Sequence, residues 1–277
     1  MMCTISENIR ALILDMDGVL WRSDSPIGDL AAIFKTIETR GLETVFATNN
    51  GTRTPREYVE RMEGFGLKVE PWQIITSSLV LAHMLSEQFP RGGNIFAVGE
   101  TGLIEALQDK NFVILPLDEA EKAQAVAIGM DRQLTVRKFS EAALLVQDGL
   151  PFFATNPDRT FPTPRGKIPG AGSWISVIST ATGITPIYAG KPSPALIELA
   201  CQRLGLPKEQ VLVVGDRLDT DIAAGQAAGC PVALVLSGVS SWAEAEAWHP
   251  PLDVIAADLE SLVKCSSEKK GIVEQDE

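Results

Sequence analysis

The chain has 277 residues, a formal net charge of −12 and 45% apolar residues. This excess of negative charge argues against nucleic-acid and membrane-surface binders, because their phosphates would repel such a surface. No segment supplies the roughly 18 consecutive apolar residues of a membrane helix, and the first residues carry charges in the wrong places for a signal peptide. We therefore expect a cytoplasmic protein with neither a nucleic acid nor a membrane as its partner.

Cysteine and histidine are scarce, and this restricts the chemistry of the site. His83 and His249 are the only histidines, which disfavours a Ser-His-Asp triad or a histidine-rich zinc site. The cysteines show no pairing or metal-ligand spacing, so we expect reduced thiols. They are Cys3, Cys201, Cys230 and Cys265.

The first elements alternate between buried strands and amphipathic helices. Ala11 to Leu14 is a continuous apolar run, as expected for a strand that is buried on both faces. Apolar residues then recur at helical spacing from Leu30 to Ile37, before Val45 to Ala47 supplies the next strand. Thr54 to Glu57 is a capping box with proline at the first helical position, which predicts the start of another helix.

The middle of the chain, residues 79–186, repeats the α/β rhythm. Two helices are expected around Leu103 to Leu107 and Phe139 to Val146. The expected strands are Ile95–Val98, Phe112–Leu115, Ala125–Ile128 and Phe152–Ala154. This pattern predicts a second, smaller α/β domain inserted into the first.

The alternation of buried strands and amphipathic helices seen in the first elements returns near the C-terminal end. Ile187 to Ala189, Val211 to Val214 and Val232 to Leu236 are the expected strands. The sequence therefore predicts an α/β fold, in which residues 1–78 and 187–277 form a discontinuous core domain with a parallel sheet. Residues 79–186 form the insert.

Four expected strands of the outer segments end in polar clusters. In an open parallel sheet, sites form beyond the carboxyl ends of the strands, so the clusters converge if these strands are neighbours. Each cluster alone has an ordinary interpretation as a turn, a helix cap or a surface lysine, but the joint pattern is far more specific. The clusters begin at Asp15, Thr48, Gly190 and Gly215.

The stretches DMDGVLW, TNN, GKPSP and VGDRLDTD, in this order, resemble the four motifs of the haloacid-dehalogenase-like phosphatases. The insert resembles the class II, subtype A cap of the group that contains nitrophenyl, phosphoglycolate and pyridoxal phosphate phosphatases and bacterial sugar phosphatases. The resemblance implies a Rossmann-like core with a cap domain, and a phosphoric monoester hydrolase that acts on a small phosphorylated metabolite. Because cap-mediated dimers are common in this family, a homodimer is a further expectation.

The resemblance makes Asp15 the nucleophile, which would form an aspartyl-phosphate intermediate. Asp17 would be the general acid and base, since it lies near enough to protonate the leaving oxygen and then deprotonate water. Lys191 would offset the negative charge at the nucleophile and hold a phosphoryl oxygen. Gly18 would let the backbone turn away sharply beside the substrate.

Several carboxylates in one crevice would repel each other and the phosphate, so the chemistry requires a cation, and Mg²⁺ suits oxygen ligands. The resemblance gives Asp15, the backbone carbonyl of Asp17, and Asp216 as ligands. Asp221 would act behind them, either through water or toward Lys191.

Phe-Ala-Thr-Asn occurs twice, at Phe46 to Asn49 and at Phe153 to Asn156. In the first copy, Thr48, the Asn49 amide and the following Asn50 would bind phosphoryl oxygens. The second copy lies in the insert, where Asn156 and Asp158 would help to sort leaving groups. The resemblance also places a specificity loop near residues 165–172.

Two other interpretations remain open at this stage. A non-catalytic, phospho-accepting receiver domain also combines acidic residues, a threonine and a lysine at strand ends, but it needs neither Asp17 nor so large an insert. Within the same superfamily, a dehalogenase would not need the Asp17 acid or the metal, and a phosphomutase commonly places its cap differently.

Overall fold

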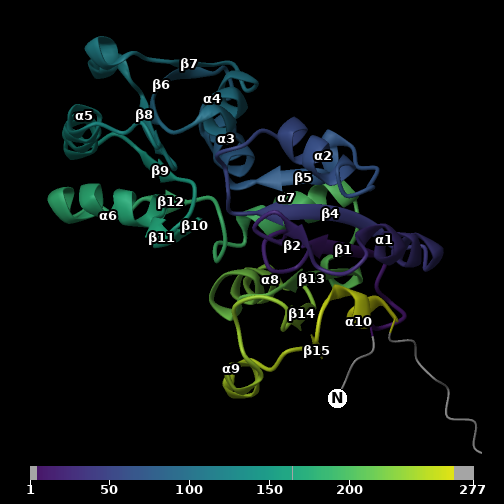
Figure 1. Cartoon of the computed structure of the whole chain (residues 1–277). Coiled ribbons are helices and arrows are strands. Elements are labelled where there is room, and N and C mark those ends of the chain that lie inside the picture. Colours follow the sequence, from purple (N-terminus) through teal and green to yellow (C-terminus); the bar gives the residue numbers. More distant parts are fainter. Residues whose placement is uncertain (1–4, 164, 265–277) are drawn as a thin grey trace, which may run out of the picture.

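The computed structural model describes residues 5–163 and 165–264 and contains two separate parallel sheets (Figure 1). The predicted α/β fold is confirmed. The first sheet has six strands, in the order β15 (Val254–Ala256), β14 (Val232–Val235), β13 (Val211–Gly215), β1 (Ala11–Leu14), β4 (Glu43–Thr48) and β5 (Ile74–Thr76). The second has five, in the order β12 (Ile187–Tyr188), β9 (Phe152–Ala154), β8 (Ala125–Ile128), β6 (Gly93–Val98) and β7 (Phe112–Ile114).

Helices connect the strands, and two short antiparallel hairpins lie outside the sheets. The hairpins are β2 (Trp21–Arg22) with β3 (Ser25–Pro26), and β10 (Thr160–Thr163) with β11 (Gly166–Pro169). The helices are α1 (Leu30–Thr39), α2 (Pro55–Glu63), α3 (Ser77–Gln88), α4 (Thr101–Gln108), α5 (Val136–Gln147), α6 (Ala171–Thr182), α7 (Ala195–Leu204), α8 (Ala223–Ala228), α9 (Trp242–Ala247) and α10 (Leu259–Lys264). Within the described ranges, none of these helices is long and apolar enough to cross a membrane.

Strand β1 lies in the middle of the first sheet, between β13 and β4, and every residue of it is buried. Its alternate side chains enter two apolar clusters. Leu12 and Leu14 pack with residues of α1, α2 and α10, whereas Ala11 and Ile13 pack with residues of α3, α7 and α8. Helices on both faces explain why the strand is a continuous apolar run. The capping box of α2 forms as the sequence predicts, with Thr54 and Glu57 bonding to each other's backbone.

The second sheet also has helices on both faces. One face packs against α5 and α6. On the other, Ile95, Ala127 and Phe153 join the apolar cluster of α3 and α4, and this cluster continues into the first sheet through Val45 and Ala47. The two sheets therefore share one continuous apolar core.

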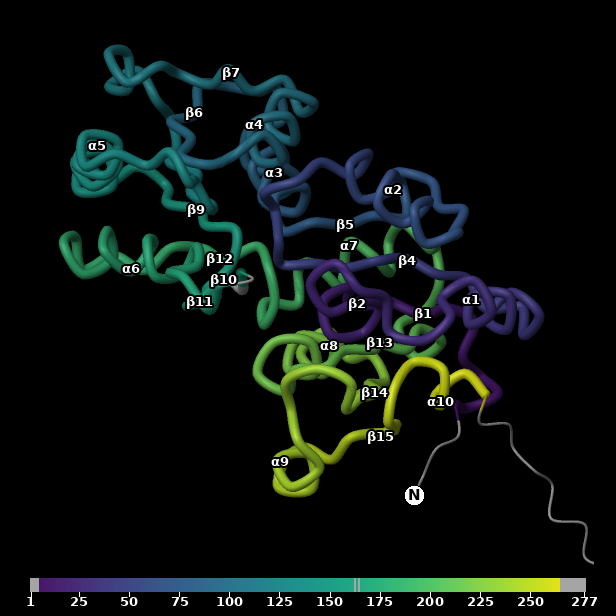
Figure 2. The backbone as a smooth tube through the Cα atoms, viewed as in Figure 1, coloured from purple at the N-terminus to yellow at the C-terminus, as the bar shows by residue number. Residues whose placement is uncertain are grey.

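The expected place of Ile187 to Ala189 in the first sheet is wrong. The strand is shorter, Ile187–Tyr188, and it pairs with β9 at the edge of the second sheet. The chain passes from there directly into the segment before α7 (Figure 2). The domain boundaries near residues 79 and 187 stay predictions. Because β12 belongs to the second sheet, a boundary that does not divide this sheet would lie after Tyr188 rather than before Ile187.

Two cysteines meet although their sequence spacing gives no sign of it. Cys201, on α7, and Cys230, directly after the turn that ends α8, are buried, with their Sγ atoms 3.7 Å apart. Both are free thiols, as expected. Cys3 and Cys265 lie outside the described residues.

Candidate functional site

The acidic pair that follows β1 occupies the carboxyl edge of the first sheet. Asp15 follows the last strand residue, and its backbone N–H donates to Val214 O of the neighbouring β13 at 2.9 Å. Gly18 then adopts a φ of +89°, and a Cβ there would lie 2.4 Å from Asp216 Oδ2. A side chain at this position would therefore be strained and would also collide with a carboxylate of the site.

Lys191 is the buried cation of the site. Its side chain is 3% exposed, and Nζ lies 2.6 Å from Asp15 Oδ1 and 2.5 Å from Asp221 Oδ1. Nζ also donates to Ala47 O at 2.9 Å, at the end of β4. Burial alone would lower the pKa of Lys191, but the Asp15 and Asp221 carboxylates raise it above its usual value. The lysine is therefore charged.

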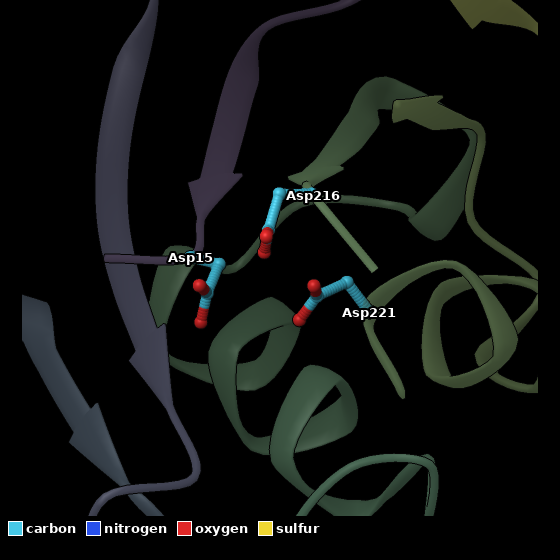
Figure 3. A group of neighbouring side chains, drawn as sticks. All are labelled: Asp15, Asp216 and Asp221. Atoms are coloured by element: carbon cyan, nitrogen blue, oxygen red, sulfur yellow. The ribbon is translucent and has the colours of Figure 1, made fainter. Parts of the chain in front are cut away.

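Three carboxylates face a common space at this edge (Figure 3). Asp15, Asp216 and Asp221 each offer an oxygen, and these oxygens all lie within 4.8 Å of one another. Burial, reinforced by the charge of Asp221, raises the pKa of Asp216 to about 7. Burial likewise raises the pKa of Asp15. One lysine does not balance three carboxylates, of which Asp216 and Asp221 are buried and Asp15 is partly buried, and an all-oxygen group of this size suits a divalent cation.

Asp17 lies beside the acidic group and is held by an indole. Trp21 Nε1 donates to Asp17 Oδ1 at 3.0 Å, and the Trp21 ring is completely buried. Burial raises the pKa of Asp17, and the bond from Trp21 partly offsets this increase. A raised pKa favours the protonated form of this carboxyl group, which suits a residue that donates a proton.

The first Phe-Ala-Thr-Asn copy ends in a tight turn at the carboxyl end of β4. Thr48 Oγ1 accepts from Asn50 N at 3.1 Å, and Asn50 Oδ1 accepts from Thr52 N at 3.1 Å. Asn49 uses both hydrogens of its side-chain amide, because Nδ2 donates to Asp158 Oδ2 and to Lys191 O, each at 2.9 Å. The NH₂ group of this side chain is thus engaged with protein atoms, whereas Asn49 Oδ1 is buried without a hydrogen-bond partner.

The second copy reaches the same place from the second sheet. Asn156 Nδ2 donates to Asn49 O at 2.7 Å. Asp158 accepts from Asn49 with one oxygen and lies 3.3 Å from Arg217 Nη1 with the other. The structure therefore brings Asn156 and Asp158 to the turn at Asn49, which is expected to bind phosphate. Asn156 bonds to the backbone of this turn, and Asp158 bonds to the Asn49 side chain and to Arg217.

The expected specificity loop lies at the β10–β11 hairpin. Residues 166–169 of β11 are exposed. Ile168 and Pro169 line a crevice of about 410 Å³ together with Phe139 and Trp174. Its role in specificity stays a prediction.

Trp21 and Arg217 also contact the site, and neither is among the site residues expected from the sequence. Arg217 stands inside the acidic stretch VGDRLDTD, and a lone cation among three carboxylates is a signal for an ion pair. Its guanidinium donates to Asp219 at 2.9 Å and reaches Asp158 at 3.3 Å. Trp21 closes the first motif, and no local pattern predicts that its indole turns back to Asp17.

A parallel α/β sheet with reactive side chains gathered beyond the carboxyl ends of its strands is the architecture of an α/β enzyme. A family model described as haloacid dehalogenase-like hydrolase matches residues 12–113, and a second model of HAD-like hydrolases matches residues 188–262. The chain belongs to the haloacid dehalogenase-like hydrolases.

Several similar proteins are named as phosphatases. An acid sugar phosphatase of Staphylococcus aureus is 34% identical over 254 residues, which are 92% of this chain and 96% of that protein. The p-nitrophenyl phosphatase from Archaeoglobus fulgidus superposes with a TM-score of 0.85 at 33% identity, covering 92% and 98% of the two chains. A glycerol phosphate phosphatase from Mycobacterium tuberculosis, solved in complex with magnesium, has a TM-score of 0.85 at 33% identity and covers 92% and 77%.

Proposed function

We propose that the protein is a Mg²⁺-dependent phosphatase that hydrolyses small phosphorylated metabolites, including sugar phosphates, through an aspartyl-phosphate at Asp15. The observation that carries the proposal is the buried group of Asp15, Lys191, Asp216 and Asp221 at one sheet edge. Phosphatase relatives that align over 92% of the chain support the same reaction and substrate class.

The carboxylate of Asp15 attacks phosphorus, and the bond from phosphorus to the leaving oxygen breaks. Asp17 donates its proton to that oxygen. Asp17 then takes a proton from water, which attacks the phosphoryl group and regenerates the Asp15 carboxylate. Each step balances without any other proton donor.

Phosphoryl oxygens would be held by Lys191, by the hydroxyl of Thr48 and by the backbone N–H of Asn49, since the backbone N–H of Asn50 already donates to Thr48 Oγ1. The Asn49 side chain is engaged elsewhere, so its contribution falls to the backbone. Fixed donors aimed at the transferring group stabilise its charge in the transition state.

The donor set fits Mg²⁺, a hard cation that prefers oxygen ligands. Asp15, Asp216 and the backbone carbonyl of Asp17 would hold the ion, whereas Asp221, which is 2.5 Å from Lys191 Nζ, would act mainly by orienting that lysine. When bound, the ion supplies positive charge beside the transferring phosphoryl group.

Phosphate release from p-nitrophenyl phosphate and from a panel of sugar and glycerol phosphates tests this proposal. We expect many turnovers per site with Mg²⁺ and loss of turnover after EDTA treatment, restored by Mg²⁺. A receiver domain would instead retain one phosphoryl group per site. A stable phosphoprotein without turnover would therefore overturn the proposal.

Metal binding should compete with protons at the acidic group. A carboxyl group whose folded-state pKa is raised favours the fold while it is protonated, and this contribution is lost as pH rises from the ordinary value of 3.8 through about 7 at Asp216. We expect the EDTA-treated protein to lose stability over this window. Mg²⁺ should accordingly raise the melting temperature more at about pH 8 than at about pH 5. Thermal unfolding with and without Mg²⁺ measures this, and an equal increase at both pH values would contradict it.

A further inference from the structure

The second sheet meets the site through the short segment of residues 155–158. Asn156 Nδ2 donates to the backbone oxygen of Asn49, and Asp158 accepts from the Asn49 side chain. Asn156 Oδ1 in turn accepts from Asp158 N at 3.1 Å, which sets the direction of the aspartate. The two asparagine loops are thus bonded to each other across more than a hundred residues of sequence.

Asp158 joins two loops of the first sheet at once. One carboxylate oxygen accepts from Asn49, which follows Thr48, and the other lies 3.3 Å from the guanidinium of Arg217. Arg217 directly follows Asp216, so the two loops carry the proposed phosphate-binding turn and the proposed metal carboxylates. Asp158 itself belongs to neither loop, since it follows β9 of the second sheet.

The bond to Asn49 continues toward the lysine. Asn49 Nδ2 also donates to the backbone oxygen of Lys191, whose side chain contacts Asp15 and Asp221. Gly190 packs so closely here that a Cβ would lie 2.6 Å from Asn49 Oδ1 and 2.6 Å from Thr155 O. A displacement of Asn49 would therefore be transmitted to the Lys191 backbone.

An ionised carboxylate has an acceptor oxygen for each of the two partners of Asp158, the Asn49 side-chain amide and the Arg217 guanidinium. Asp158 is 20% exposed in its side chain, and an anion at this depth forms stronger bonds to its donors than a neutral group does. An asparagine has one acceptor oxygen, so its NH₂ group would face either the Asn49 amide or the Arg217 guanidinium.

We propose that Asp158 is a positioning residue of the phosphatase reaction: from the second sheet, it holds the Asn49 turn and the Arg217 loop at their working separation. This role differs from the expected sorting of leaving groups, because it acts on every substrate alike. The inference rests on the proposed function, and Asp158 contacts no reacting atom in it.

Replacing Asp158 with Asn tests the inference in the full-length protein with Mg²⁺. We expect kcat for p-nitrophenyl phosphate to fall about tenfold to a hundredfold, because small misplacements of catalytic groups have effects of this size. KM should change by less than about threefold, since the substrate-binding groups remain present. The loss should be similar for a sugar phosphate.

Asp219→Asn is the matched control. It removes the other carboxylate from the same guanidinium, but Asp219 is 71% exposed and lies in the same loop as Arg217. If the link to the second sheet is what matters, this variant should keep kcat within about twofold of the wild type, as expected for an exposed ion pair.

Arg217→Gln interrupts the same link from the other side and leaves the Asp158–Asn49 bond in place. It should lower kcat in the same direction, and the double variant should lose less than the product of the two single losses. This second variant also decides the question if Asp158→Asn does not fold.

Suppose that the wild type turns over, but that folded Asp158→Asn or Arg217→Gln has the same kcat as the wild type. This result would overturn the positioning role of Asp158 and leave the proposed function standing. A loss confined to KM, or one that differs strongly between substrates, would also overturn it in favour of leaving-group recognition. Absence of wild-type turnover on every phosphate ester would instead overturn the proposed function.

Discussion

Replacing Asp15 with Asn should lower kcat for p-nitrophenyl phosphate by more than about a thousandfold, which corresponds to about 4 kcal/mol on the activation barrier. An amide is a far weaker nucleophile than a carboxylate and cannot form the acyl phosphate. The fold should survive, because Asn has nearly the same size and its oxygen can still accept the bond from Lys191.

The same substitution should leave the metal-free protein as stable as the wild type or more stable. Burial and the neighbouring carboxylates raise the pKa of Asp15, so its ionised form is costly in the fold. Thermal unfolding measures this, and acid quenching with a ³²P-labelled substrate tests whether phosphate becomes attached to the protein. Full turnover in a correctly folded Asp15→Asn protein would refute the nucleophile assignment.

Replacing Lys191 with Met should damage both activity and stability. Met fills a similar volume without the charge, so Asp15 and Asp221 would lose their buried cation. Breaking a buried ion pair from one side typically costs about 3–5 kcal/mol, and loss of a donor to the phosphoryl group should lower kcat by at least about a hundredfold.

The stability loss in Lys191→Met should have a diagnostic pattern. It should be larger at about pH 8 than at about pH 5, because the carboxylates can take up protons at the lower pH. Mg²⁺ should restore more stability to the variant than it adds to the wild type, since it supplies the missing positive charge. Chemical denaturation with and without Mg²⁺ measures both effects. A variant as stable as the wild type at about pH 8 would show that Lys191 does not balance the acidic group.

Local sequence signals predicted the main elements and several of the residues that the structure brings together at the edge of the first sheet. Runs such as Ala11 to Leu14 and Ala125 to Ile128 are strands with those same bounds, because buried parallel strands are uninterrupted apolar runs. The residues that end β1, β4 and β13 then meet because parallel neighbours end at one edge. Here, local pattern and sheet topology point to the same residues.

The failures concern partners that lie far apart in the sequence. The apolar run at Ile187 is a strand, but nothing local tells which of two parallel sheets will take a two-residue strand. The bonds from Asn156 and Asp158 to Asn49 span 107 and 109 residues, so only the three-dimensional arrangement reveals them. The meeting of Cys201 and Cys230 likewise depends on how α7 and α8 pack.

The apolar cluster shared by the two sheets limits how this enzyme can acquire new substrates. Removing residues 79–186 would take α4 and most of α3 out of the apolar cluster that also holds Val45 and Ala47, and would leave the two-residue strand β12, shortly before Lys191, without its partner β9. The insert is therefore not a detachable module. Substitutions that change the accepted leaving group are better tolerated in β11. Its residues are exposed, so replacing them does not disturb the apolar core that the two sheets share.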